Sequence, residues 1–310
     1  MEARTSKNSK RAVSGIAAVL FLLLLSTLAS VNAYQVGDTF RDCATCPEMV
    51  VLPAGKFTMG SPEGERGRYD DEGPQHQVTI PEPFAVGKYE VTVGQYTEFV
   101  TETKHKTGNC SYPGDGTWRD PGFKQSNEHP VVCVSWDDAL TYTYWLSLKS
   151  EREYRLLTET EWEYAARAGT TSEYHFGRVI LGNQANYNNK NEGTVVVGSY
   201  PSNAFGLHDM HGNVWEWVED CWHDDYTGAP MNSNAWLSGC RKGSENDCRY
   251  YSGDALSICK ELIVGKVLRV LRGGSWDNDS KSVRSAARDG GSAAYLHSYL
   301  GFRVARTLTP

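Results

Sequence analysis

The sequence has no cysteine after Cys259, so its C-terminal part offers no thiol for disulfide formation, metal binding or redox chemistry. It also has no G-x-S-x-G motif, which argues against the serine nucleophile of an α/β-hydrolase. Positive charge is scarce, because 31 Lys and Arg residues stand against 38 Asp and Glu residues and the net charge is −7. Nucleic-acid phosphates are bound by clustered Lys and Arg, so we expect no nucleic-acid partner.

Long apolar runs are lacking, with one exception near the N-terminus. Four basic residues lie within residues 1–15, residues 16–29 are mostly apolar, and Val31-Asn32-Ala33 matches a signal-peptidase site. This order predicts a secretory signal peptide over residues 1–33. A membrane anchor is the alternative, but the run is shorter than the ~20 apolar residues of a typical span.

Cleavage after Ala33 would remove four positive charges and one negative charge, so the net charge would change from −7 to −10. We therefore expect an exported protein, periplasmic or secreted, with no stable membrane insertion after signal cleavage. We expect it to be a monomer.

Eight cysteines in an exported chain favour disulfide bonds. The C-x-x-C pair of Cys43 and Cys46 is followed at once by Pro47, and no second such pair completes a zinc site, so we interpret it as a structural clip. The connectivity is not fixed by sequence alone. The simplest assignment joins neighbouring cysteines, as Cys43–Cys46, Cys110–Cys133, Cys221–Cys240 and Cys248–Cys259.

Local patterns predict short elements rather than long ones. Residues 49–61 alternate in polarity around a Pro-Ala-Gly turn and predict a β-hairpin, and residues 76–80 predict a strand. A polar segment with two extra cysteines, residues 241–266, is interpreted as a loop insertion. Three helices are expected to begin at capping boxes. These are formed by Thr92 with Gln95, Ser135 with Asp138, and Thr158 with Glu161, and Gly169 is expected to end the third helix.

Seven stretches carry a family resemblance, and they lie at residues 49–61, 84–100, 129–147, 154–169, 204–217, 270–276 and 300–306. In this order they resemble the formylglycine-generating enzyme family, also called sulfatase-modifying factors. The resemblance implies one compact α+β domain over residues 34–310, with a C-type-lectin-like fold and little regular secondary structure. Founding members oxidise a cysteine of an unfolded sulfatase to formylglycine with O₂, copper and a pair of active-site cysteines.

The chain departs from the family at this cysteine pair. The first cysteine of the family lies three residues after the Ser of its GGS motif, and here that position is Asn278. The second would fall within residues 280–283, which hold no cysteine. Because an amide does not replace a thiolate as a Cu(I) ligand, we expect no copper bound in the family's manner.

Residues 206–217 match the second calcium site of the family. The resemblance implies oxygen ligands, which suit Ca²⁺, from the Asp209 and Glu216 side chains and the carbonyls of Gly212 and Val214. A polar turn with packed tryptophans is the alternative. The first calcium site of the family would begin at Asn186 and Tyr187, but the loop with its other ligands is shorter here.

The segment after GGS supplies candidates for the substrate groove of the family. They are Ser275, Trp276, Asn278, Arg288, Tyr295 and His297. An alternative for Arg288, as for Arg284 and Arg303, is that it braces the fold through carboxylates. No catalytic residue is assigned.

Two functions from different classes remain open. One is a divergent oxidoreductase or protein-modification factor; relatives include exported oxidoreductases of siderophore-chromophore maturation. The other is a non-catalytic module that binds a protein or a small molecule in the C-terminal groove. Residues 277–299 are rich in Asp, Asn, Ser, Gly, Ala and Tyr, which resembles diversified binding loops. A third hypothesis is an inactive partner that holds a sulfatase or an active paralogue.

Overall fold

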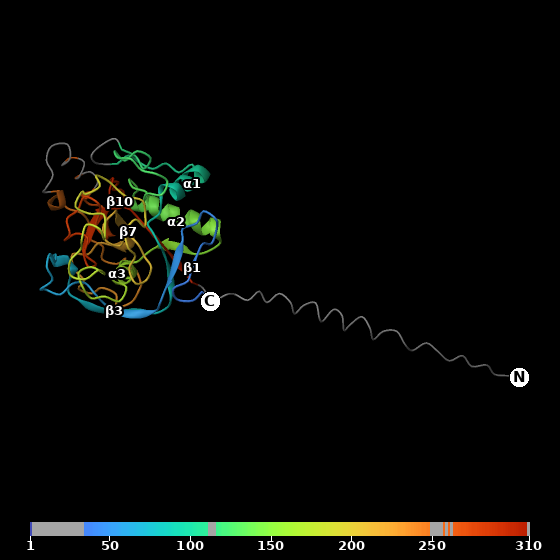
Figure 1. The fold of residues 1–310 in the computed structure, drawn as a ribbon, viewed down its shortest axis with the longest axis horizontal. Helices are drawn as coiled ribbons and strands as arrows, with labels where there is room; N and C mark the ends of the chain where they lie inside the picture. Colours follow the sequence, from blue (N-terminus) through green and yellow to red (C-terminus); the bar gives the residue numbers. More distant parts are fainter. Residues whose placement is uncertain (2–33, 111–115, 249–256, 258–259, 261–262, 309–310) are drawn as a thin grey trace. The chain divides into compact units, whose positions relative to one another are not determined.

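The computed structural model describes residues 1, 34–110, 116–248, 257, 260 and 263–308 (Figure 1). Its contacts divide the chain into two units, residues 1–34 and 35–310, and everything below lies within the second unit. The signal peptide predicted over residues 1–33 falls outside the described residues, apart from Met1. Among the described residues, no helix is both long and apolar enough to cross a membrane.

Short strands form three sheets. The first has the order β1-β2-β5-β11-β6 and is built from Thr39–Phe40, Met49–Leu52, Phe84–Gly87, Val304–Thr307 and Tyr154–Leu156. The second has the order β10-β7-β8-β9 and is built from Leu300–Gly301, Trp215–Cys221, Leu268–Arg272 and Arg288–Ser292. The third pairs β3, Gly55–Met59, with β4, His76–Ile80. Two 3₁₀ turns, η1 and η2, span Asp70–Glu72 and Glu245–Cys248. Because β10 and β11 lie in different sheets, the C-terminal segment links the two larger sheets.

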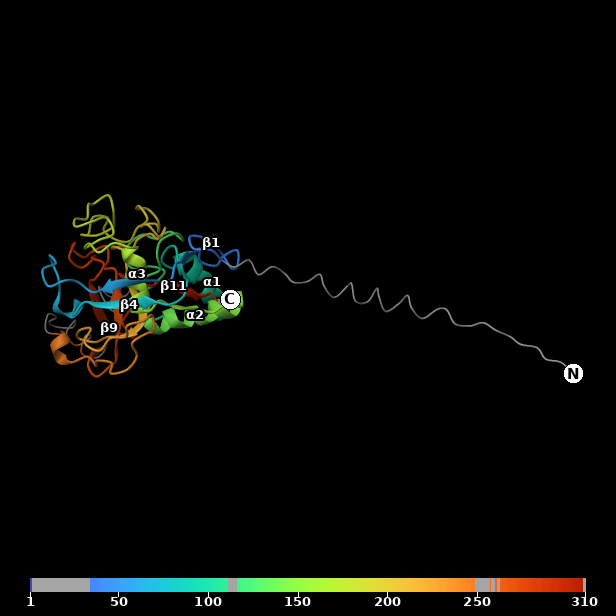
Figure 2. The same ribbon diagram turned by 90° about the horizontal axis from the view of Figure 1, so that it is seen from below.

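The three predicted capping boxes are confirmed, and each begins an α-helix. The helices are α1, Val93–Thr103, α2, Trp136–Ser150, and α3, Glu159–Arg167. In each box the cap side chain accepts a backbone N–H, while the side chain three residues later accepts the N–H of the cap. Helix α3 ends with Ala168 in the left-handed conformation and Gly169 at φ +88°, so the predicted end is confirmed. Helices α1 and α2 lie side by side (Figures 1 and 2).

The hairpin predicted over residues 49–61 is wrong. Strand β2 pairs with β1 and β5, whereas β3 pairs with β4 in a separate sheet. The Pro-Ala-Gly segment therefore carries the chain from one sheet to another. Gly55 is held close to α3, where a Cβ would lie 2.6 Å from the hydroxyl oxygen of Tyr164. The expected strand at residues 76–80 is confirmed as β4.

Aromatic side chains fill much of the core. Trp162, Trp217, Tyr96, Tyr142 and Phe302 are almost fully buried. Trp217 and Trp136 donate their indole N–H groups to the carbonyls of Val134 and Val218, so α2 and β7 are joined by polar as well as apolar contacts.

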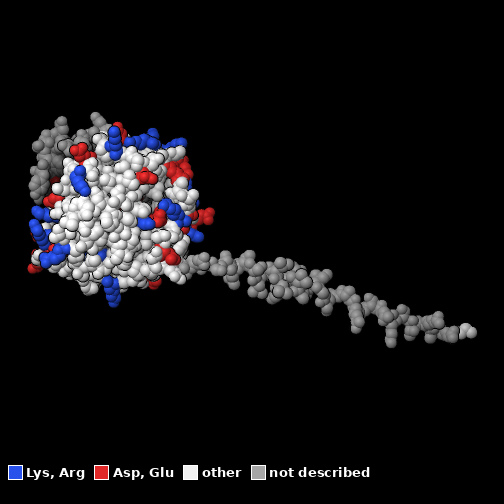
Figure 3. Space-filling model, in the orientation of Figure 1, with Lys and Arg blue, Asp and Glu red and all other residues white. Residues whose placement is uncertain are grey.

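Four buried arginines form what we call the arginine–carboxylate core. The ion pairs are Arg272–Glu163, Arg284–Glu72, Arg288–Glu159 and Arg303–Glu216. Each joins residues more than 80 positions apart, since their separations are 109, 212, 129 and 87 residues. Bonded carboxylates allow these charges to be buried, so the core ties α3 to β8 and β9, β7 to the residue before β11, and η1 to the loop before β9. On the face in Figure 3, charged residues lie mainly near the edges, and no extended basic patch is visible.

Three of the four predicted disulfides are present. They join Cys43 to Cys46, Cys110 to Cys133, and Cys221 to Cys240. The predicted Cys248–Cys259 bond involves Cys259, which lies outside the described residues. Disulfide bonds fit a location outside the cytoplasm, where thiols are not kept reduced.

Candidate functional site

The loop that departs from the family pattern begins where β8 ends at Arg272. Gly273 and Gly274 turn the chain there with φ +96° and φ +69°. A Cβ on Gly274 would lie 2.6 Å from the carbonyl oxygen of Ser282 and 2.6 Å from Val283 Cγ1. Only glycine combines this conformation with so close an approach, so the GGS sequence is required by the backbone path.

Asn278 closes this loop with its side-chain amide. Its Oδ1 accepts hydrogen bonds from the Ser275 backbone N–H at 3.0 Å and the Ser275 hydroxyl at 2.9 Å. The same buried hydroxyl lies 2.6 Å from Asp277 Oδ1, and the Asn278 N–H donates to the Ser275 carbonyl at 3.2 Å. The position of the family's first cysteine is thus occupied by a hydrogen-bonding group that orders the turn.

Trp276 connects this loop to the C-terminal segment. Its indole N–H donates to the Ser298 carbonyl at 3.3 Å, and its ring packs edge-on against Phe123 with centroids 5.5 Å apart. Its backbone is held by Asn213 and Asn189. The half-buried ring therefore presents one aromatic edge beside residues 295–299.

Tyr295 and His297, two of the expected groove residues, belong to that segment. The His297 ring stacks on Tyr299 with centroids 3.6 Å apart, and burial lowers the pKa of His297 to about 4. The imidazole is therefore neutral at pH 7. The His297 carbonyl accepts the backbone N–H of Cys133 at 3.0 Å, which fastens the segment to the disulfide-bonded loop.

Arg288 does not share a site with these residues. Its guanidinium is buried, binds both oxygens of Glu159 at 2.8 and 2.9 Å, and lies over the rings of Trp222 and Tyr226. The structure places Arg288 in the arginine–carboxylate core. There the Glu159 carboxylate compensates the guanidinium charge, and the rings of Trp222 and Tyr226 pack against the guanidinium. The groove candidate is thus corrected to a bracing residue, which is the alternative that the sequence left open.

The residues expected to bind calcium lie around Arg303. Asp209 has φ +58° and accepts the Gly198 N–H through Oδ2 at 2.6 Å. Glu216 accepts Arg303 at both oxygens, at 2.7 Å each, and Oε2 also accepts the Trp162 indole at 2.9 Å. One lone pair of Glu216 Oε1 is left by these bonds.

The segments of the two expected calcium sites touch where the backbone at Gly212 and Asn213 approaches the Asn186 carbonyl. Val214 is buried, and a Cβ on Gly212 would lie 2.2 Å from the Asn186 carbonyl oxygen. The buried Asn186 side chain is bonded to Gly193, Asn191 and Asn213, while the Tyr187 hydroxyl donates to Ile180. Asn186 and Tyr187 therefore act in hydrogen bonding here, and their side chains are turned to protein partners.

The donor chemistry at Asp209 and Glu216 fits a hard cation, since two carboxylates and backbone carbonyls are the oxygen ligands that Ca²⁺ takes. Within the described ranges, His, Cys, Asp and Glu side chains form no group of three or more that would hold a metal ion. Carboxylates alone therefore do not make a metal site there, and the carbonyls of Gly212 and Val214 would have to contribute.

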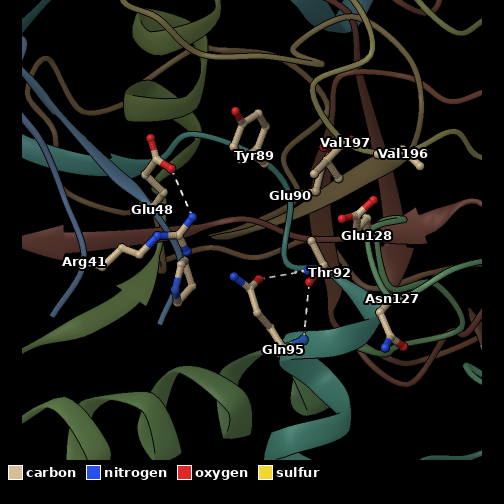
Figure 4. A pocket seen from close by; sticks show the side chains of 11 residues that line it. Arg41, Glu48, Tyr89, Glu90, Thr92, Gln95, Asn127, Glu128, Val196 and Val197 are labelled. Carbon is tan, nitrogen blue, oxygen red and sulfur yellow. Dashed lines mark hydrogen bonds and ion pairs between the residues drawn. The ribbon is translucent and has the colours of Figure 1, made fainter. Parts of the chain in front are cut away.

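A pocket of about 380 Å³ is linked to these residues through the hydrogen bond between Glu90 and Asn213, and the sequence did not predict it. It opens between the start of α1 and the segments around Tyr89, Asn127 and Val196 (Figure 4). Glu90 lines it, is 1% exposed, and has one oxygen, Oε2, without a hydrogen-bond partner among the described residues. In the sequence, Glu90 lies within the family stretch 84–100, but nothing near it distinguishes it as a site residue.

The fold and the GGS loop define a C-type-lectin-like domain of the kind found in sulfatase-modifying factors. The family model of the sulfatase-modifying factor enzyme 1-like domain matches residues 35–308, and the chain belongs to this family.

Relatives with and without activity are similar to this chain. The formylglycine-generating enzyme of Mycobacterium tuberculosis is 34% identical over 55% of this chain and 73% of its own length. The inactive C-alpha-formylglycine-generating enzyme 2 of mouse is 33% identical over 63% of this chain and 74% of its own length. The structure of PvdO from Pseudomonas aeruginosa is 38% identical with a TM-score of 0.76, covering 89% of this chain and 100% of PvdO. The chain spans only 38% of a matching chlamydial protein kinase, pkn1 of Chlamydia caviae.

Proposed function

We propose that the protein is an exported family member that acts without copper held by two thiolates, as a divergent oxidoreductase or protein-modification factor. The observation that supports this proposal most directly is at Asn278, which occupies the position of the family's first active-site cysteine. Its side-chain oxygen accepts hydrogen bonds from the Ser275 N–H and hydroxyl. Relatives named as active and as inactive enzymes are both similar to this chain, so the domain is compatible with loss of the founding reaction.

The proposed ligand-binding surface is formed by the half-buried Trp276, Tyr295 and Tyr299, with the buried His297 ring stacked on Tyr299. Trp276 and Tyr295 are half-buried, so a protein or small-molecule ligand would stack on their exposed ring faces. This surface would act by stacking and not through a bound metal ion. The neutral His297 ring supports stacking more than acid–base chemistry at pH 7, since its pKa is about 4.

A non-catalytic binding module is the second candidate, and the hydrogen bonding of the loop favours it. Ser275, the hydroxyl next to the lost copper site, is fully buried and bonded to Asp277 and Asn278. A hydroxyl that is fully buried is not accessible to a substrate as a nucleophile, although the Asp277 carboxylate lies beside it.

Calcium is proposed as the structural cofactor, held by Asp209, Glu216 and the carbonyls of Gly212 and Val214. When bound, the ion would add positive charge next to two buried carboxylates that have Arg303 as a shared cation. Burial is the largest cause that raises the pKa of Asp209, and a cation would reverse this shift.

The first test is metal analysis of the purified mature protein, with calcium, copper and iron measured on the same sample. We expect about one equivalent of calcium and only traces of copper and iron. The same protein is then incubated with a cysteine-containing sulfatase peptide and O₂, with the M. tuberculosis enzyme as the positive control, and no aldehyde is expected. Stoichiometric copper together with aldehyde formation would overturn the proposal.

Oxygen consumption with candidate small-molecule substrates then separates the two candidates. Turnover by the wild type would establish the oxidoreductase. Saturable ligand binding without turnover would establish the binding module.

A further inference from the structure

A second pocket, which we call the β3–α3 pocket, shares no lining residue with the pocket at α1. Its volume is about 360 Å³, which is within the range of small-molecule sites. It is lined by residues of β3, β4, α3 and the segment after α3, together with Phe205. The missing side chain of Gly55 lets β3 approach Tyr164 of α3, and this approach brings the two elements together at the pocket.

Three aromatic rings form one wall of the β3–α3 pocket. The Tyr164 ring lies between Phe57 and Phe205, with centroids 5.5 and 5.4 Å apart and planes tilted by 54° and 49°. The Tyr164 hydroxyl donates to the Pro53 carbonyl at 3.2 Å, so it already has an acceptor. Phe57 and Phe205 are half-buried, so part of each ring is accessible to a ligand. The wall therefore offers apolar contact to a flat or ring-shaped group.

The charged groups at the β3–α3 pocket are basic, although the chain as a whole carries a net charge of −7. Among the described residues that line it, none is Asp or Glu, and the two charged ones are Lys56 and Arg167. The buried Arg167 guanidinium is compensated, because its Nε donates to Glu163 at 2.8 Å. Lys56 is exposed, and no described residue forms an ion pair with its ammonium group. The accessible charge of the pocket is therefore positive.

Hydroxyl groups lie at the same pocket. Lys56 and Thr58 are two residues apart on β3, so their side chains project to the same side of the strand. The Thr58 hydroxyl accepts the Gln77 amide, which leaves its own proton available for a ligand oxygen. Thr171 is exposed at the pocket as well. An ammonium group and a hydroxyl together match the two acceptor oxygens of one carboxylate.

We propose that the β3–α3 pocket binds a small aromatic monocarboxylate. Its ring packs on Phe57, Tyr164 and Phe205, and its carboxylate accepts hydrogen bonds from Lys56 and Thr58. An amine would be repelled by Lys56, and a neutral alcohol would leave that ammonium group without a counter-charge. The site is independent of the proposed function, which concerns the aromatic surface at Trp276.

The test is an amide NMR titration of the full mature protein with phenylacetate. Phenethyl alcohol is the uncharged probe, and acetate is the probe without a ring. We expect saturable shifts of the amides around Lys56, Thr58 and Thr171 with phenylacetate, and binding at least fivefold weaker for each of the other probes. Shifts confined to residues 295–299 would place phenylacetate on the aromatic surface at Trp276. That result would overturn this proposal and leave the proposed function standing.

Two variants test the two parts of the site. Lys56→Met keeps most of the side-chain stem and removes the charge, so phenylacetate should bind about threefold to tenfold more weakly. The exposed Lys124→Met, outside the pocket, should bind it as the wild type does. Thr171→Trp fills the pocket from an exposed position and should abolish binding without unfolding the protein. No saturable binding by the wild type, equal binding of phenethyl alcohol, or binding unaffected by Thr171→Trp would each overturn the proposal.

Discussion

Glu216 in the arginine–carboxylate core and Glu90 beside the pocket at α1 are equally buried, yet their surroundings differ. Both oxygens of Glu216 accept Arg303, and one also accepts Trp162. Glu90 has a single amide partner on one oxygen and none on the other among the described residues. A buried charge persists only when it is compensated, so Arg303 compensates Glu216, whereas burial raises the pKa of Glu90 and favours its neutral form.

Removing a guanidinium from the core should have the largest effect. Arg284→Met would leave Glu72 and Glu65 buried without their cation, so the free energy of unfolding should fall by about 3–5 kcal/mol. Urea unfolding under non-reducing conditions measures it. The exposed neighbour Arg66→Met serves as the control and should change the stability by less than about 0.5 kcal/mol. A small loss for Arg284→Met would mean that the core does not hold the fold.

Neutralising the two compared carboxylates should give unequal results. Glu216→Gln would leave Arg303 without its counter-charge and should lower the free energy of unfolding by about 3 kcal/mol. Glu90→Gln should change it by less than about 1 kcal/mol, because burial already favours the neutral form of Glu90 and the amide oxygen still accepts Asn213. Unfolding is measured at pH 7 in EDTA. Equal losses in both variants would remove the distinction between the two regions.

Asp71 lies near Arg288 of the arginine–carboxylate core, and one of its carboxyl oxygens has no hydrogen-bond partner among the described residues. This carboxyl group predicts that the stability of the fold depends on pH. Burial raises its pKa to about 7, and the nearby Arg288 opposes the shift. The native state therefore holds this proton more tightly than the unfolded chain, so stability should fall as the pH rises from about 4 to 7.

Asp71→Asn should remove about 1–2 kcal/mol of this fall, a figure reduced for partial exposure. Unfolding curves between pH 4 and pH 8 measure the slope. The fully exposed neighbour Asp70→Asn should keep the wild-type slope. An unchanged slope in Asp71→Asn would show that another group titrates.

The smallest effect is expected at the loop that lost its cysteine. Asn278→Ala removes the two hydrogen bonds that its side chain accepts from Ser275, so the free energy of unfolding should fall by about 1 kcal/mol. Hydrogen exchange of the Ser275 amide should become faster, whereas the exposed neighbour Ser280→Ala should leave it unchanged. Unchanged exchange in Asn278→Ala would mean that the amide does not order the turn.

Features with local causes were predictable from the sequence. The capping boxes place both partners within four residues, so Thr92, Ser135 and Thr158 identified the helix starts. The position of Asn278 followed from the GGS motif in the same way. The pairing of β2 and β3 was not predictable, because strand partners are chosen across the whole domain rather than at the intervening turn.

The interactions of charged residues were the least accessible to sequence reasoning. The partner of Arg288 lies 129 residues earlier, so nothing near it distinguished a bracing role from a groove position. Glu90 was not predicted for the same reason, since its hydrogen-bond partner Asn213 lies 123 residues away in the sequence. Such features arise from packing that the linear sequence does not encode locally.

One backbone contact has a consequence for how samples of this protein are handled. The Cys133 N–H donates to His297, and Cys133 is disulfide-bonded to Cys110. Dithiothreitol, which is common in purification buffers, would reduce the Cys110–Cys133 bond. We expect this to loosen the loop that holds the His297 segment, although the loop lies more than 160 residues earlier in the chain. A preparation from a reducing cytosol should therefore be compared with a secreted one before its ligand binding is measured.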